Sequence, residues 1–166
     1  MRSSKPVLLG IAAICIGLIG AALYLQIVEH MLPCPLCVLQ RYAFIAIAIF
    51  CLIGAAMPRG TRRISIGLAT ASGFTGIGIA TKHLYVLANP GFSCGIDPLE
   101  TGLNKIFLAN WWPTLFRADG LCEIPYPPTL GLSLPAWAMI GFVLMTCTLL
   151  FLFFSREKTG MFGKHR

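Results

Sequence analysis

Residues 130–154 read LGLSLPAWAMIGFVLMTCTLLFLFF and contain no charged side chain. At about 1.5 Å per residue, a helix of this length crosses a hydrocarbon core about 30 Å thick. Three further stretches are nearly as apolar, at residues 7–28, 38–57 and 64–87. Within lipid only helices or closed barrels satisfy their backbone hydrogen bonds, and alternating ten-residue strands are absent. The sequence therefore predicts an all-α membrane protein, a bundle of four transmembrane helices.

The composition of the whole chain agrees with this prediction. Of its 166 residues, 57% are hydrophobic and 11% are charged. With Gly added and Tyr removed, about 65% are apolar, against roughly 45–50% in soluble domains. These values exclude both a water-soluble fold and a disordered chain. We expect one domain, residues 1–166, that has membrane lipid as its main surroundings.

The basic residues cluster on one side of the predicted spans. Nine of the 13 Lys and Arg lie before the first span, between the second and third, or after the fourth: Arg2, Lys5, Arg59, Arg62, Arg63, Arg156, Lys158, Lys164 and Arg166. The positive-inside rule predicts that this side, with both termini, is cytoplasmic. The net charge of +7 then reflects topology, and we expect no nucleic-acid partner.

Two loops are predicted on the external side, a short one at residues 29–37 and a long one at residues 88–129. At about 42 residues the long loop is near the size below which a chain rarely folds without a covalent staple. Residues 103–117 within it are rich in aromatic and aliphatic side chains. They suit either a short helix lying in the headgroup zone or a segment packed on the helix ends.

The seven cysteines fall into two classes under this topology. Three lie inside predicted spans and are expected to be packing residues: Cys15, Cys51 and Cys147. The other four lie on the external side, two in each loop: Cys34, Cys37, Cys94 and Cys122. An even number of thiols on the oxidising face of a membrane is typical of disulfides.

The four external cysteines allow three interpretations. Zinc is disfavoured, because Cys94 and Cys122 have 27 residues between them and no His beside either, so no metal is expected. A structural disulfide suits this widely spaced pair, which could staple the long loop. It suits Cys34 and Cys37 badly, because bridging two intervening residues removes little chain entropy. The Cys-x-x-Cys spacing favours redox chemistry.

The surroundings of Cys37 support a redox site. Cys37 should occupy the first turn of the second helix, where unpaired amides and the positive dipole end stabilise a thiolate. Arg41 follows one turn later on the same face and could hold a thiolate or a polar headgroup, or could simply anchor the helix at the interface. His83, near the external end of the third span, is expected at similar depth if the spans are antiparallel, although a lone His there is often an interface residue.

Small residues recur at a spacing of four along two predicted spans. They are Ala13, Gly17 and Ala21 in the first, and Ser72, Gly76 and Ala80 in the third. This spacing allows membrane helices to pack closely, so both stripes are predicted to face neighbouring helices.

The ordered set of motifs resembles the DsbB family, the bacterial disulfide bond formation proteins B. It covers nearly the whole chain and consists of Pro33-Cys34-Pro35-Leu36-Cys37, Gln40-Arg41, Lys82-His83, the widely spaced Cys94 and Cys122, and GLSLPAW at residues 131–137. Three features depart from the family pattern: Pro35 within the Cys-x-x-Cys, Gln40 before the arginine, and the length of the long loop. None of them removes a chemical group that the family's mechanism requires.

The resemblance implies an inner-membrane enzyme that reoxidises a periplasmic DsbA-like thiol oxidase and passes two electrons to the quinone pool, ubiquinone or menaquinone. By position, the partner would attack Cys94, which would be disulfide-bonded to Cys122. Cys34 would exchange with these loop cysteines. Cys37 would supply the thiolate that contacts the quinone ring, Arg41 would stabilise this thiolate and the ring oxygen, and His83 would form a hydrogen bond nearby.

Two alternatives remain open at this stage. A vitamin K epoxide reductase-like enzyme also combines a Cys-x-x-Cys with loop cysteines, but there the Cys-x-x-Cys follows the loop cysteines and here it precedes them. The other alternative is a non-enzymatic four-helix membrane protein whose loops are held by structural disulfides.

Overall fold

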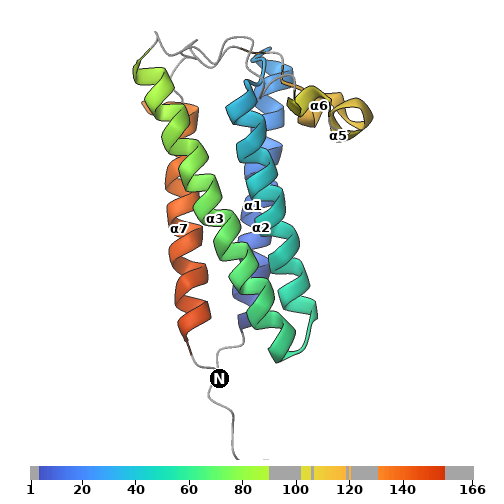
Figure 1. The fold of residues 1–166 in the computed structure, drawn as a ribbon, viewed down its shortest axis with the longest axis vertical. Coiled ribbons are helices and arrows are strands. Elements are labelled where there is room, and N and C mark those ends of the chain that lie inside the picture. The colour runs from blue at the N-terminus through green and yellow to red at the C-terminus, as the bar shows by residue number, and fades with distance from the viewer. Residues whose placement is uncertain (1–3, 90–101, 106, 119, 121–130, 156–166) are drawn as a thin grey trace, which may run out of the picture.

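The computed structural model describes residues 4–89, 102–105, 107–118, 120 and 131–155. Four of its helices are long and apolar enough to cross a membrane (Figure 1): α1 (Ser4–Val28), α2 (Pro35–Ala56), α3 (Arg59–Ala88) and α7 (Leu134–Phe154). The predicted fold class, an all-α bundle of four transmembrane helices, is confirmed.

All four helix starts differ from the expected ranges by three to five residues, and α1 and α7 begin at Ser4 and Leu134 rather than at residues 7 and 130. The helix α2 begins at Pro35 rather than at residue 38, because proline is well suited to the first position of a helix. The short loop therefore ends at Cys34. The helix α3 begins at Arg59 rather than at residue 64, since the backbone is already helical over the polar residues that precede the apolar stretch.

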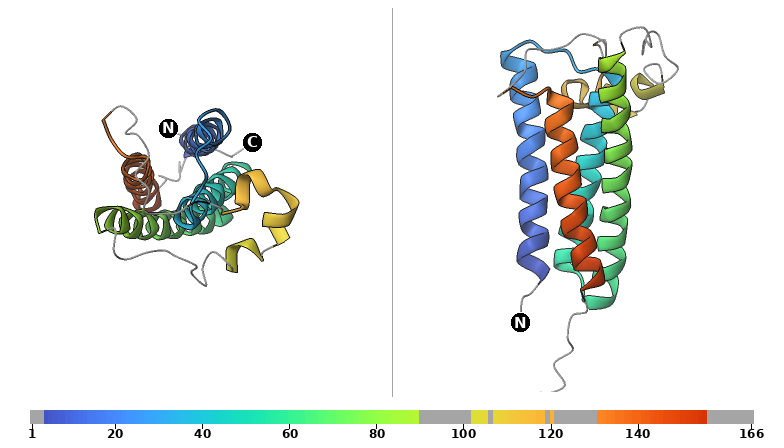
Figure 2. Two further views of the ribbon diagram at one scale, coloured as in Figure 1. Left: turned by 90° about the horizontal axis from the view of Figure 1, so that it is seen from above. Right: turned by 90° about the vertical axis from the view of Figure 1, so that its left-hand side faces the viewer.

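The helices α2 and α3 form the centre of the bundle. Helix α1 packs on α2, and α7 packs on α3 (Figure 2). The fully buried side chains between them include Leu8, Ile47, Phe142 and Leu149. Cys15 and Cys51 lie in this core, as expected for packing residues, and the Cys15 sulfur lies 3.3 Å from the Met145 sulfur. The expectation was wrong for Cys147, which is exposed on the outer face of α7.

Small residues make the contact between α3 and α7. Gly76 lies directly against the ring of Phe142, and Gly73 against Thr146. The Phe142 ring in turn stacks on Phe44, with ring centroids 4.0 Å apart. The predicted close packing along this stripe of the third span is thus confirmed at Gly76, and Ala80 is buried in the core, whereas Ser72 is only partly buried.

The corresponding stripe on α1 was assigned to the wrong face. Ala13, Gly17 and Ala21 are exposed, whereas α1 buries the adjacent face that carries Leu8 and Cys15. Among the described residues, helix α1 packs mainly against α2 and also meets α7 through Cys15, and the face with the small residues lies outside these contacts.

Two short helices of the long loop, α5 (Phe107–Trp111) and α6 (Pro113–Phe116), lie beside the N-terminal end of α2 (Figures 1 and 2). The ring of Phe116 stacks on Tyr42 of α2 at 4.8 Å. Phe107, Trp111 and Trp112 remain exposed. The segment therefore combines the two expectations for residues 103–117, because it is helical, although broken, and it packs on a helix end.

Candidate functional site

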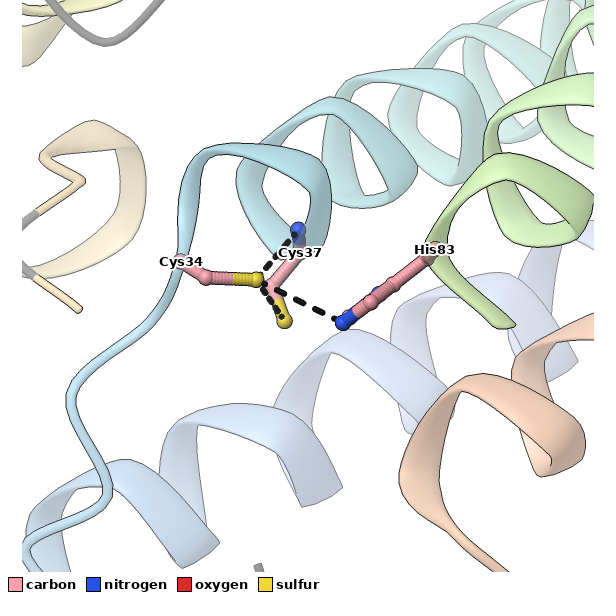
Figure 3. A group of neighbouring side chains, drawn as sticks. All are labelled: Cys34, Cys37 and His83. Atoms are coloured by element: carbon pink, nitrogen blue, oxygen red, sulfur yellow. Dashed lines mark hydrogen bonds between the residues drawn. The ribbon is translucent and has the colours of Figure 1, made fainter. Parts of the chain in front are cut away.

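Cys34 and Cys37 lie at the start of α2. Cys34 is the residue that caps the helix, in an extended conformation, and its sulfur accepts a hydrogen bond from the Cys37 backbone N–H at 3.3 Å (Figure 3). Pro35 follows at the first helical position, where its missing N–H costs nothing. Cys37 occupies the first turn of α2, as predicted from the sequence.

The two sulfur atoms are in direct contact. They lie 2.9 Å apart in a thiol–thiol hydrogen bond. Cys34 is 2% exposed, whereas Cys37 is only partly buried. The two thiols thus differ in access from outside, and Cys37 is the more accessible one.

His83 approaches the pair from α3, as Figure 3 shows. Its Nε2 lies 3.6 Å from the Cys34 sulfur, and its side chain is 4% exposed. The antiparallel arrangement of neighbouring spans was the reason to expect His83 at the depth of the cysteines. The structure adds that His83 contacts Cys34, the buried member of the pair.

Gln40 is a member of the site whose contact the sequence analysis did not identify. Its side-chain Nε2 lies 3.4 Å from Nδ1 of His83, on the side of the ring away from Cys34, and it is buried. The available signal was a polar amide in the second turn of an apolar helix, because a buried amide needs a hydrogen-bond partner.

Arg41 lies one turn beyond Cys37 on α2 and is also buried. Its positive charge lies near enough to both cysteines to stabilise a thiolate at either sulfur. Its Nη1 donates a hydrogen bond to the carbonyl of Leu115 in α6 at 3.2 Å. Arg41 therefore connects the cysteine pair to the helical part of the long loop, a contact that nothing in the sequence indicated.

A second point of attachment for the long loop lies just before the cysteines. The backbone N–H of Gly120 donates to the carbonyl of Pro33 at 3.1 Å. A Cβ atom at position 120 would collide with the carbonyl oxygen of Leu32. The other two predicted site residues, Cys94 and Cys122, lie outside the described residues.

The donor atoms of the site suit two kinds of ligand. The sulfurs of Cys34 and Cys37 and a ring nitrogen of His83 lie within 4.8 Å of one another, a set that could hold a metal ion. A quinone presents carbonyl oxygens and an electron-poor ring, which fit N–H donors and a sulfur nucleophile. Arg41 has five N–H donors, and Leu115 takes one of them, so the residues present also fit a quinone.

Comparison with known proteins identifies the family. The sequence model of the family described as "Disulfide bond formation protein DsbB" matches residues 4–152. Relatives named "Disulfide bond formation protein B" include one from Herminiimonas arsenicoxydans, 49% identical over 95% of this chain and 99% of its own length. Another, from Ralstonia nicotianae, is 47% identical over 94% of this chain and 98% of its own length.

A relative from Pseudomonas putida, named "Disulfide bond formation protein B 1", is 52% identical over 83% of this chain and 82% of its own length. The resemblance inferred from the ordered motifs is therefore confirmed. The chain belongs to the DsbB family of disulfide bond formation proteins.

Proposed function

We propose that the protein reoxidises a periplasmic DsbA-like thiol oxidase and passes the two electrons to a membrane quinone, ubiquinone or menaquinone. The observation that carries this proposal is the sulfur contact between buried Cys34 and partly buried Cys37 at a helix N-terminus, with buried His83 and Arg41 beside them. A purely structural disulfide between Cys34 and Cys37 would not require a buried histidine and a buried arginine beside it.

The exchange steps use the four external cysteines. A thiolate of the reduced partner attacks Cys94, breaks its disulfide with Cys122, and forms a mixed disulfide. The partner's second thiolate then resolves the mixed disulfide, so the partner leaves oxidised and the two loop cysteines are left reduced. These in turn reduce the Cys34–Cys37 disulfide by attack at Cys34. The attachment of Gly120 to Pro33 supports this route, because it holds the chain close to Cys34 only two residues before Cys122.

Cys37 is the sulfur assigned to the quinone side. The positive end of the α2 dipole stabilises its thiolate, and it is the more exposed of the two. Arg41 adds a positive charge close to both sulfurs. When bound, quinone supplies a two-electron acceptor that takes up two protons and leaves as quinol.

His83 has a different assignment from the one implied by the resemblance alone. Its contact with Cys34 supports a role in stabilising the thiolate that Cys34 becomes when it is released in exchange.

The topology that goes with this chemistry is a multi-pass protein of the bacterial inner membrane, with both termini cytoplasmic and the cysteine pair on the periplasmic side.

The test is quinone reduction by the purified protein supplied with a reduced DsbA-like protein. Wild type should consume one quinone per partner oxidised, and Cys37→Ser should abolish the reaction. Cys147→Ser removes an exposed thiol on the outer face of α7 and is the matched control, which should keep the wild-type rate. Persistent quinone reduction in Cys37→Ser, or no reaction in wild type, would contradict the proposal.

A further inference from the structure

We propose that the reduced protein binds a soft divalent metal ion such as Zn²⁺ through Cys34, Cys37 and His83, and that the bound ion holds the cysteine pair in its dithiolate form. The three donor atoms come from two helices and lie within 4.8 Å of one another. The site is built by the fold, because His83 reaches the cysteines from α3, 46 residues beyond Cys37 in the sequence.

The geometry is close to that of a tetrahedral zinc site. With Zn–S about 2.3 Å and Zn–N about 2.05 Å, a sulfur and a nitrogen on one ion lie about 3.6 Å apart. The Cys34 sulfur and His83 Nε2 lie 3.6 Å apart. Two sulfurs on one ion lie about 3.8 Å apart, so the 2.9 Å contact must open by about 0.9 Å when the ion binds.

The donor chemistry is that of zinc proteins. Two cysteines separated by two residues are a common half-site for zinc, and histidine is a common third ligand. A ligating histidine is usually oriented by a hydrogen bond at its other nitrogen. Gln40 lies against Nδ1 of His83. With Nε2 on the ion, Nδ1 carries the ring proton, and the Gln40 amide, turned so that its Oε1 faces the ring, would accept this N–H.

Charge balance also permits a cation beside Arg41. Binding releases one proton from each thiol and transfers no electrons, so two thiolates neutralise the divalent ion and leave the local charge of Arg41 as it was. Three protein ligands leave a fourth position for water, the pattern of exchangeable rather than structural zinc. We expect the ion to be removable by a chelator.

Metal and disulfide exclude each other at this pair. A Cys34–Cys37 disulfide has no thiolate to offer, so only the reduced protein binds the ion. A consequence that rests on the proposed function is that Zn²⁺ slows quinone reduction by trapping the dithiolate.

Binding can be measured with Co²⁺ as a spectroscopic probe and Zn²⁺ as competitor. The protein should be the full chain in detergent, carrying Cys94→Ser and Cys122→Ser so that the loop thiols contribute nothing. After anaerobic reduction and removal of the reductant, one equivalent of Co²⁺ should give a thiolate charge-transfer band and the strong visible bands of tetrahedral cobalt. Zn²⁺ should displace it, and the oxidised protein should give neither band.

Variants then assign the ligands. His83→Ala and His83→Gln should weaken Co²⁺ binding by about tenfold or more, and Cys37→Ser should abolish the charge-transfer band. His30→Ala, at an exposed histidine, should bind like the parent. Absence of the cobalt bands in the reduced parent, or an unchanged spectrum in both His83 variants, would overturn the proposal. If the metal-free protein failed to reduce quinone, the proposed function would fail while the cobalt result stood.

Discussion

The Nε2 atom of His83 lies 3.6 Å from the sulfur of Cys34, the buried member of the cysteine pair. Cys34 is also the sulfur that accepts the backbone N–H of Cys37. Two hydrogen-bond donors are therefore available to a thiolate on Cys34. This arrangement suits Cys34 as the sulfur that is released as a thiolate, and later forms a disulfide again, during exchange with the loop cysteines.

We predict that His83→Ala slows quinone reduction by about ten- to a hundredfold. A hydrogen bond to a charged group contributes about 1.5–3 kcal/mol, and about 1.4 kcal/mol corresponds to tenfold. His83→Gln, which keeps a donor, should recover part of the rate. The measurement is the initial rate of quinone loss with a reduced partner, and His30→Ala is the control at an exposed histidine. Equal rates in wild type and His83→Ala would show that the contact has no part in the reaction.

Gln40 is predicted to act through His83. The amide lies 3.4 Å from Nδ1 of the ring, so Gln40→Leu removes a neutral hydrogen bond of about 1 kcal/mol and should lower the rate about fivefold. Because the effect passes through the imidazole, Gln40→Leu should have no further effect in a His83→Ala background. Rates of the two single variants and the double variant give this coupling directly. Additive losses would mean that Gln40 acts elsewhere.

The sequence alone predicted the depth of the site but not its contacts. Apolar length located the four spans, and the antiparallel order of neighbouring spans put His83 level with Cys37 and Arg41. Which sulfur His83 meets depends on how α2 and α3 are rotated about their axes, and that rotation is set by packing along their whole length. The exposed stripe of Ala13, Gly17 and Ala21 on α1 was misassigned for the same reason.

Arg62 illustrates a second limit of sequence-based prediction. Under the positive-inside rule, Arg62 is only one of the basic residues that mark the cytoplasmic side, and it is expected at the surface. In the structure it is buried, and it donates from Nε to the carbonyl of Gly54 at 3.1 Å and from Nη2 to that of Met57 at 3.3 Å. The last carbonyls of a helix lack intrahelical donors, so this arginine completes the end of α2. Such a role depends on the turn between α2 and α3, which composition does not reveal.

Arg41→Lys is predicted to raise the KM for quinone and to lower kcat less than Arg41→Ala does. Lysine keeps the positive charge near both sulfurs but loses the planar set of donors that can contact Leu115 and a quinone oxygen together. The measurement is the dependence of the rate on quinone concentration. Arg63→Ala is the matched control, because that exposed arginine lies over the Phe153 ring at 5.2 Å and away from the cysteines. A KM unchanged in both Arg41 variants would remove this residue from the quinone site.

Gly120→Val should slow oxidation of the partner while leaving the Cys34–Cys37 pair able to react with quinone. A side chain at position 120 meets the backbone of Leu32 and Pro33, which cannot move aside as a flexible side chain would. The Gly120 to Pro33 hydrogen bond should then be lost. The two half-reactions can be measured separately, with the reduced partner and with a small dithiol that reduces Cys34–Cys37 directly. Gly102→Val, in open space in the same loop, should leave both unchanged, and an equal loss in both half-reactions of Gly120→Val would contradict the docking role.

Gly76→Ala and Gly78→Ala should change stability in opposite directions. Both glycines lie in α3, where alanine favours the helix by up to about 1 kcal/mol. Position 78 has no atom within 4 Å of an added Cβ, so the helical preference acts alone and the unfolding temperature should rise slightly. At position 76 the added methyl overlaps the ring of Phe142, which is fully buried and held against Phe44. Overpacking of this kind costs about 1–3 kcal/mol, which corresponds to a fall of several degrees in the unfolding temperature for a chain of about this size.

Thermal unfolding in detergent, followed by circular dichroism, measures both changes. A rise in Gly76→Ala equal to that in Gly78→Ala would mean that α7 can move away from α3, and that their close packing does not hold the bundle together.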